Sequence, residues 1–377
     1  MAAAAIRDTA VLVALTIVTV PGIVASLLAR RLFSRSDIPL KEDLRRSILR
    51  GLSAVLPLAT IKRFNAPPRT DTLLNSPRFS EYKHPLCTPV STAAFTGTWI
   101  RAPSQGKDET PFVLLWFHGG AYCLGHALGN TTTLLRVSEL ITERKPDISL
   151  AILSVEYSLG PTAKFPTQQH EALAAYRYLI DQGIAPERII IAGVSAGGHL
   201  AISCLLAIAG EGLAKPCGAL LLCPWVNLNN ASPSFETNRH RDTLSKRLLD
   251  RCAKAVGAGL GEDCEPDALR LVDFTTPRFH LAHGPRTWAD ILPARPWVNV
   301  GSHDVFLHDI QAFVQNASAD GASAELQVSP GMAHAWQFKL DRATQAEYCG
   351  LGPGEDVPGG VMTGSENIAE GLLRVLG

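Results

Sequence analysis

The sequence lacks an excess of charge of either sign, because its 377 residues include 35 basic and 35 acidic side chains. It also lacks a basic cluster with interleaved aromatic residues, the pattern with which proteins bind nucleic acid. No phosphate-binding loop, dinucleotide fingerprint or metal-ligand spacing is present. These absences argue against a nucleic-acid partner and predict a protein that needs no cofactor or metal.

Cysteine is sparse, and its eight positions are irregular and distant from one another. They therefore form no disulfide framework and leave the redox compartment open. Apolar residues, in contrast, make up 46% of the chain, which is enough for one large core. Expected strands and helices alternate from about residue 98 to 376, and this alternation predicts an α/β fold with one mostly parallel sheet.

The most informative stretch is a serine set between glycines, Gly193-Val194-Ser195-Ala196-Gly197. Residues 189–192 form a short apolar run typical of a buried strand, and a helical pattern begins at Ala196. A strand, a sharp turn and a helix are the setting of a nucleophile elbow. The glycines remove side chains that would collide at such a turn, and the helix N-terminus favours a developing oxyanion. We therefore predict that Ser195 is a catalytic nucleophile.

A glycine-rich corner lies about 75 residues upstream of this serine. The apolar run 112–117 predicts a strand, and His118-Gly119-Gly120-Ala121-Tyr122 follows it. Such a corner allows backbone N–H groups to point at a substrate oxygen. The order of the two motifs is that of an oxyanion loop followed by a nucleophile in α/β hydrolases. His118 is expected to shape this loop by hydrogen bonding rather than to act as a base.

The nucleophile needs a base and an orienting acid, which follow it along the chain in this fold. Asp304 lies just after a predicted strand at 295–301, where functional residues gather in open α/β sheets. Asp309, one helical turn later, is a weaker candidate and is expected to be an exposed helix residue. His334 lies on the loop after the last predicted strand, at 324–328. We expect His334 to take the Ser195 proton while Asp304 fixes its tautomer.

Several further segments resemble the hormone-sensitive-lipase and arylacetamide-deacetylase family of α/β hydrolases, including its membrane-anchored steryl acetyl hydrolases. The resemblance covers about residues 112–338. Besides the two glycine motifs, the segments that carry it are Val155–Pro161, Phe165-Pro166, Glu171–Tyr176, Pro224–Leu228, Ile291–Pro293 and Pro330–His334. It implies an α/β-hydrolase fold, with a mostly parallel central sheet, helices on both faces and a helical cap.

Carried over residue by residue, the resemblance implies a triad of Ser195, Asp304 and His334. The implied oxyanion loop and its backbone donors are Gly119, Gly120, Ala121 and Ala196. Ala121 replaces the family's third glycine, and Ser158 replaces an arginine of the family. An alanine still donates an N–H, and we expect the oxyanion hole to survive if φ at Ala121 is below zero.

The resemblance and the chain length together suggest three parts. Residues 1–35 are expected to form a hydrophobic membrane anchor, and residues 36–95 an N-terminal cap region. Residues 96–377 are expected to form the catalytic domain, with a cap insertion at about 227–294.

The expected anchor has no charge from Val11 to Ala29, and Arg30, Arg31 and Arg35 follow. Nineteen residues reach about 28 Å as a helix, enough to cross a bilayer core. A cleaved signal peptide, and an apolar helix that lies on the membrane or on the cap, are the alternatives. The positive-inside rule would place the enzyme in the cytosol, whereas the resembling deacetylases face the endoplasmic reticulum lumen. The side of the membrane therefore stays open.

These observations together predict a serine carboxylester hydrolase on a membrane, with the endoplasmic reticulum as the expected location. The expected partner is a small hydrophobic ester, an acetate or short-acyl ester of a sterol, a lipid or a secondary metabolite. One alternative is a biosynthetic enzyme of the same fold that transfers the acyl group or cyclises its substrate. Another is a ligand-binding protein without catalysis. The sequence does not indicate the oligomeric state.

Overall fold

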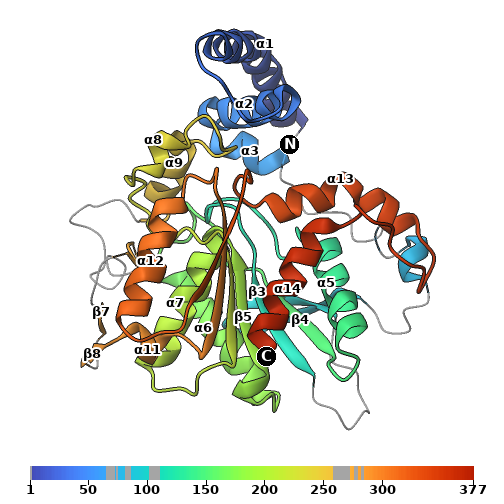
Figure 1. Ribbon diagram of the computed structural model, residues 1–377, viewed down its shortest axis with the longest axis vertical. Helices are drawn as coiled ribbons and strands as arrows, with labels where there is room; N and C mark the ends of the chain where they lie inside the picture. The colour runs from blue at the N-terminus through green and yellow to red at the C-terminus, as the bar shows by residue number, and fades with distance from the viewer. Residues whose placement is uncertain are drawn as a thin grey trace.

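The computed structural model describes residues 2–64, 73, 75–80, 86–101, 111–257, 272–275, 279–281 and 284–377. Its centre is one eight-stranded sheet (Figure 1). The strands, in their order across the sheet, are β1 Thr88–Ser91, β2 Thr96–Arg101, β4 Leu150–Val155, β3 Phe112–Phe117, β5 Ile189–Val194, β6 Gly218–Leu222, β9 Arg295–Gly301 and β10 Glu325–Ser329. From β4 to β10 neighbouring strands are parallel, whereas β2, near one edge, pairs antiparallel with both β1 and β4.

The central strands are apolar because both faces of the sheet are covered. Every residue of β4, β5 and β6 is buried, and parallel strands enclosed in this way have continuous rather than alternating apolar patterns. Helices α5 Thr131–Arg144, α13 Trp336–Gly350 and α14 Thr363–Leu376 pack together, and α14 lies on β6 and β9. Helices α6 Thr167–Asp181, α7 Ala196–Gly210, α11 Trp288–Ile291 and α12 Leu307–Ala319 form the other layer (Figure 1). The α/β-hydrolase fold expected from the sequence is confirmed.

A group of helices lies beyond the carboxyl edge of the sheet, at the top of Figure 1. It contains α1 Ala2–Phe33, α2 Leu40–Val55 and α3 Leu58–Phe64, together with α8 Ser234–Thr237 and α9 Lys246–Ala255. The Arg251 guanidinium of α9 donates to the carbonyls of Ser53 and Leu56, which joins the N-terminal helices to the insertion. The remaining short elements are η1 Pro77–Phe79, η2 Pro186–Arg188 and the hairpin of β7 Phe279–Leu281 and β8 Gly284–Arg286.

Helix α1 is held to α2 near its C-terminal end. Arg30 and Arg31 each donate to the carboxylate of Asp43, at 2.7 and 2.8 Å, and this carboxylate is fully buried. Leu27 is buried as well, whereas Ile17 and Val18, between two and three turns earlier, are exposed. The helix contains an 18-residue window, Thr16–Phe33, that is long and apolar enough to cross a membrane. One part of α1 is therefore packed against the protein, and another part presents apolar surface.

Candidate active site

The nucleophile elbow is built by close backbone packing between β5 and α7. Ser195 has φ 58° and ψ −120°, a strained conformation for a residue with a side chain. A Cβ atom at Gly193 would lie 2.2 Å from the carbonyl oxygen of Gly197, and one at Gly197 would lie 2.0 Å from that of Phe117. Only glycine fits at these two positions, so the elbow motif follows directly from the tight turn.

The oxyanion loop after β3 runs beside this elbow. A Cβ atom at Gly119 would lie 3.4 Å from the Cβ of Ser195, so the two backbones are in close contact. Gly120 has φ 124°, and the next two residues, Ala121 and Tyr122, have φ 50° and 60°. Backbone N–H groups placed beside a nucleophile can donate to the oxygen of a substrate. The position of this loop beside Ser195 is therefore the one expected of an oxyanion loop.

At Ala121 φ is positive, so the condition that the sequence analysis set for the oxyanion hole, φ below zero, is not met. The N–H of an alanine is nevertheless a donor at either sign of φ. The left-handed conformation costs an L-residue with a side chain about 1–2 kcal/mol, and a glycine would avoid this cost. The Ala121 side chain is buried and lines the cavity described below. The methyl group thus occupies space at this cavity that a glycine would leave open.

His118 supports the oxyanion loop from behind. Its Nδ1–H donates to the carbonyl of Gly119 at 2.7 Å, and its ring stacks on Tyr157 with centroids 4.2 Å apart. The Tyr157 hydroxyl in turn donates to the His118 carbonyl. Burial lowers the pKa of His118 to about 4, so the ring is neutral at physiological pH. This position is the structural one that the sequence suggested for His118.

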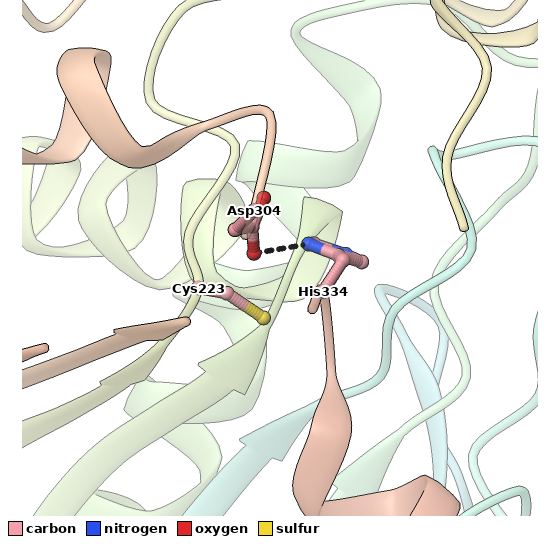
Figure 2. A group of neighbouring side chains, drawn as sticks. All are labelled: Cys223, Asp304 and His334. Carbon is pink, nitrogen blue, oxygen red and sulfur yellow. Dashed lines mark hydrogen bonds and ion pairs between the residues drawn. The ribbon is translucent and has the colours of Figure 1, made fainter. Parts of the chain in front are cut away.

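Asp304 and His334 meet on the loops after β9 and β10 (Figure 2). His334 Nδ1 donates to Asp304 Oδ2 at 2.9 Å, and the other carboxylate oxygen accepts from the N–H of Phe306 at 2.9 Å. A carboxylate accepts but cannot donate, so the proton lies on Nδ1 and the neutral ring keeps a lone pair on Nε2. The pair is therefore arranged as an orienting acid and a base.

Burial has opposite effects on the two members of this pair. It raises the pKa of Asp304, while the hydrogen bonds from His334 and Phe306 act in the other direction. For His334 burial favours the neutral ring, yet the Cys223 sulfur and the Asp304 carboxylate raise its pKa well above the ordinary value. The site thus stabilises the imidazolium that a general base forms during acyl transfer.

The cavity beside these groups has a volume of about 270 Å³. Ser195, His334, Gly119, Gly120 and Ala121 all line it, so the predicted nucleophile, base and oxyanion loop face one space. In the part of the chain that the structure describes, no hydrogen bond joins the Ser195 hydroxyl to His334. Catalytic hydrogen bonds are often long before substrate binds. The remaining walls include the apolar side chains Leu124, Val194, Leu244, Leu248, Leu249 and Phe338.

Ala196, the other predicted backbone donor, is the first residue of α7 and is buried directly after Ser195. The first N–H groups of a helix have no partner within it and point toward a bound anion. Ala196 therefore lies where an oxyanion donor of the elbow is expected.

Asp309 is not an exposed helix residue, contrary to the expectation from the sequence. Its side chain is only 4% exposed and accepts hydrogen bonds from Ser232 and, at longer distance, Asn227. Burial raises its pKa to about 6. It faces the segment after β6 rather than His334, so the structure separates it from the candidate triad.

Cys223 is a neighbour of the pair that the sequence did not suggest. Its sulfur, a carboxylate oxygen of Asp304 and a ring nitrogen of His334 lie within 4.8 Å of one another (Figure 2). Sulfur, oxygen and nitrogen in this arrangement are possible metal ligands. Asp304 and His334 already satisfy each other by a hydrogen bond, so we interpret the cluster as an acid–base pair with an adjacent thiol.

Ser158, which replaces the family's arginine, keeps a polar partner. Its N–H and hydroxyl both donate to the carboxylate of Glu171, at 2.7 and 2.5 Å. A neutral side chain and a backbone group thus satisfy this carboxylate in place of an ion pair.

Comparison with known proteins places these features in a family. A family profile described as the alpha/beta hydrolase fold matches residues 114–338. An acetyl-hydrolase of Streptomyces hygroscopicus is 31% identical over 252 residues, which are 66% of this chain and 75% of that protein. An esterase of Acinetobacter venetianus is 26% identical over 250 residues, covering 66% of this chain and 74% of its own length.

A solved structure gives the same result. The crystal structure of an esterase from the bacterial hormone-sensitive lipase family aligns with 85% of this chain and 96% of its own, at 26% identity. Its TM-score of 0.58 corresponds to a shared fold. The family resemblance predicted from the motifs is therefore confirmed.

Proposed function

Because this chain belongs to the α/β hydrolase fold family and is a carboxylic ester hydrolase, we propose that Ser195, His334 and Asp304 carry out its reaction. The observation that supports this proposal best is the shared cavity. Ser195, on a strained elbow, and His334, hydrogen-bonded to Asp304, line it together with Gly120 and Ala121.

In the proposed mechanism the Ser195 hydroxyl attacks the ester carbonyl, and His334 Nε2 accepts its proton. The N–H groups of Gly120, Ala121 and Ala196 stabilise the oxyanion that forms. The imidazolium then protonates the departing alcohol, which leaves an acyl group on Ser195. A water molecule, deprotonated by His334, attacks this acyl-enzyme and releases the carboxylic acid. Asp304 holds the Nδ1 proton throughout and does not need to be protonated itself.

We propose that the substrates are hydrophobic acetate or short-acyl esters. The cavity is small, at about 270 Å³, and Leu244, Leu248, Leu249 and Phe338 supply apolar walls. Ala121 also lines the cavity, and its side chain takes space that a glycine would leave free. Apolar walls favour a water-poor ester, while limited volume disfavours a long acyl chain. Similarity to an acetyl-hydrolase points in the same direction.

We further propose that α1 attaches the enzyme to a membrane as a single span. The support is the uncharged segment from Val11 to Ala29 and the apolar window Thr16–Phe33 of α1. Helix α2, on which α1 packs, contacts the loops at the carboxyl edge of the sheet, so the attachment lies at the same end as the cavity. Hydrophobic esters concentrate in a bilayer, which makes this location useful for the proposed substrates.

The first prediction tests the nucleophile. Ser195→Ala is expected to lower ester hydrolysis a thousandfold or more and to abolish labelling by a fluorophosphonate probe, because triad members act as a unit. The matched control is Ser203→Ala, which removes a buried hydroxyl from α7, the helix that follows Ser195. Among the described residues, this hydroxyl bonds only to His199. Labelling that persists in Ser195→Ala would place the nucleophile elsewhere.

The products distinguish hydrolysis from acyl transfer. Free acid and alcohol in equal amounts from p-nitrophenyl esters, and then from acetylated lipophilic alcohols, are the expected result. A transferred acyl group or a cyclised product would favour a biosynthetic enzyme instead. A series from acetyl to octanoyl esters tests the acyl preference, with kcat/KM expected to fall as the chain lengthens.

A further inference from the structure

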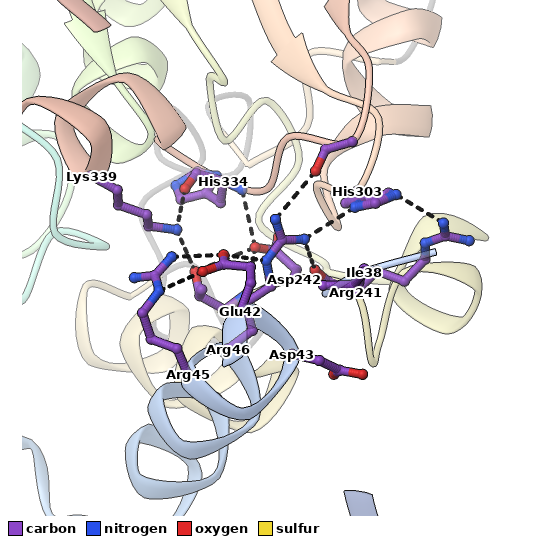
Figure 3. Close-up of polar contacts among 12 residues, drawn as sticks. Ile38, Glu42, Asp43, Arg45, Arg46, Arg241, Asp242, His303, His334 and Lys339 are labelled. Carbon is purple, nitrogen blue, oxygen red and sulfur yellow. Dashed lines mark hydrogen bonds and ion pairs between the residues drawn. The ribbon is translucent and has the colours of Figure 1, made fainter. Parts of the chain in front are cut away.

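The backbone of His334 is fixed from both sides by charged side chains that belong to neither the elbow nor the triad. Its N–H donates to Asp242 Oδ1 at 3.1 Å. Its carbonyl accepts a hydrogen bond from the ammonium of Lys339, on the first turn of α13. The N–H and the carbonyl of His334 are therefore held by two side chains of opposite charge (Figure 3).

Asp242 also holds the loop that carries the acid. Its Oδ2 accepts from the N–H of Val305 at 2.9 Å, and Val305 is the residue after Asp304. Oδ1 accepts from the N–H of Thr243, while the Thr243 hydroxyl accepts a hydrogen bond from Lys339. The Asp242 side chain is fully buried. One carboxylate thus connects the histidine loop, the aspartate loop and the insertion between β6 and β9.

Helix α2 holds the backbone of the segment that carries this carboxylate. The guanidinium of Arg50 donates to the Asp242 carbonyl, and Arg46 donates to the carbonyls of Arg241 and Gly331. Gly331 lies three residues before His334, so Arg46 contacts two of the segments that Asp242 joins, the insertion and the histidine loop. Arg46 and Asp242 are buried, and these contacts restrict movement of the insertion and of the histidine loop.

We propose that Asp242 and Lys339 are positioning residues that hold His334 in register between Ser195 and Asp304. The proposal rests on the function proposed above. A histidine on a loop has no regular hydrogen bonds to fix its backbone, and a displacement of about 1 Å at a catalytic group can cost on the order of a hundredfold in rate. Buried, charge-assisted hydrogen bonds to its N–H and its carbonyl supply the missing restraint.

The two residues also act on the charge of the ring, and in opposite directions. The negative charge of Asp242 favours the imidazolium of His334, whereas the positive charge of Lys339 disfavours it. Asp304 and Cys223 also act on the charge of His334, and His118, His126 and Arg342 line the same cavity. None of these groups is changed in the experiment below. The charged groups behind Asp242 and Lys339 are Arg45, Arg46 and Arg50 of α2.

The test compares the full-length, detergent-solubilised variants Asp242→Asn and Lys339→Met with the wild type. We expect kcat for p-nitrophenyl acetate to fall about tenfold to a hundredfold in each, with KM changed less than threefold. The acid limb of the pH profile, where kcat/KM falls at low pH because His334 becomes protonated, should move to lower pH in Asp242→Asn. It should move to higher pH in Lys339→Met. A shift of about half a pH unit or more is expected from charges at this distance.

The matched control is Asp341→Asn. Asp341 is also a buried carboxylate that accepts from two backbone N–H groups, those of Gly364 and Ser365, but it lies away from the triad. A purely structural role predicts that Asp242→Asn behaves like Asp341→Asn, with a lower melting temperature and an unchanged acid limb. Acid limbs that stay in place, or that move in the same direction in both variants, would overturn the proposal.

A second measurement does not depend on ester hydrolysis. The proton that His334 Nδ1 shares with Asp304 is expected to give a far-downfield proton NMR signal in the wild type. This signal should lose intensity in Asp242→Asn and persist in Asp341→Asn. A signal unchanged in both would overturn the proposal. A wild type that shows this signal but hydrolyses no ester would contradict the proposed function instead. If Asp242→Asn does not fold, Lys339→Met serves for the same test. In that variant, an unshifted acid limb of kcat/KM together with an unchanged NMR signal counts against the proposal.

Discussion

Two aspartates that lie within five residues of each other provide a direct comparison at the residue scale. Asp304→Asn is expected to lower turnover by roughly three to four orders of magnitude, because an amide does not hold His334 in the productive tautomer. Asp309→Asn should retain activity within a few-fold, since its partners are Ser232 and Asn227. Turnover of both purified variants, measured beside their melting temperatures, checks this. Greater loss in Asp309→Asn would mean that the acid has been misassigned.

Asp309 also gives a pH-dependent effect on stability. Its pKa is about 6 in the folded protein, above the value of about 3.9 for an unfolded chain. The folded state therefore binds the proton more tightly, and stability is lost as pH rises from about 4 to about 6. The loss relative to Asp309→Asn is up to about 3 kcal/mol. Urea denaturation of both proteins at pH 4 and pH 7 measures this loss. If the stability of Asp309→Asn relative to the wild type does not increase from pH 4 to pH 7, the burial argument is contradicted.

The charge of His334 sets the expected pH dependence of catalysis. Ser195 needs the neutral imidazole as its base, and the pKa of His334 is raised well above the ordinary value of about 6.5. Activity should consequently fall as pH decreases through a value above 6.5, rather than near or below it. A pH profile of kcat/KM for a neutral ester shows the position of this limb. An inflection below 6.5 would show that the ring is not stabilised in its charged form.

At the residue scale, the sequence predicted backbone geometry where a local motif has a steric cause. The glycines around Ser195 are required by backbone contacts of about 2 Å, so the motif carries information about the turn itself. The positive φ of Ala121 could not be read in this way, because alanine gives no sign of a left-handed conformation. Asp242 was missed for a related reason. Its role depends on loops about 60 and 90 residues away along the chain.

At the scale of elements, the strands were the most predictable part. Runs such as 189–192 and 112–117 are apolar throughout, and buried parallel strands have this pattern. The first strand, β1, lies within the segment expected to be an N-terminal cap region. It was not predicted as a strand, because its four residues include a proline and contain no run of apolar side chains. The burial of Asp309 escaped prediction because α12 is covered on a second side by the segment after β6, which its own periodicity does not reveal.

The contact between α1 and α2 yields a prediction at this scale. Changing both Arg30 and Arg31 to Gln should leave the buried carboxylate of Asp43 without its two ionic partners. Breaking a buried pair by removing one side destabilises a protein by about 3–5 kcal/mol, and partial exposure of the arginines reduces this value. Hydrogen exchange of α2 measures the effect.

The control for this experiment is the triple variant that adds Asp43→Asn. It should recover much of the lost protection, because the amide carries no buried charge. An α2 that exchanges equally in the wild type and in the double variant would show that the ion pairs contribute little to its stability.

For the whole molecule, the prediction concerns membrane attachment. The full-length protein should stay in the membrane pellet after high-salt and carbonate washes, since burial rather than charge holds a spanning helix. Deletion of residues 1–33 should release an enzyme that still hydrolyses small water-soluble esters. Because this deletion also removes the partners of Asp43, the companion change Asp43→Asn is included.

Two outcomes would contradict this prediction in different ways. Full-length protein in the wash supernatant would exclude a spanning helix. Aggregation of the truncated protein would favour the alternative in which α1 covers the cap, since its removal would then expose apolar surface.

The proximity of α1–α2 and the catalytic loops, at one end of the molecule, has a consequence for how encounters occur. A dissolved ester must search a volume to reach a freely diffusing enzyme, whereas an ester within a bilayer searches only a plane when the enzyme is tethered there. The fold would also limit how far the cavity can tilt from that plane, because Arg46 and Arg50 of α2 bond directly to the segments that hold the base. Collision frequency with lipid-borne esters would thus depend on the area density of both molecules rather than on their bulk concentrations.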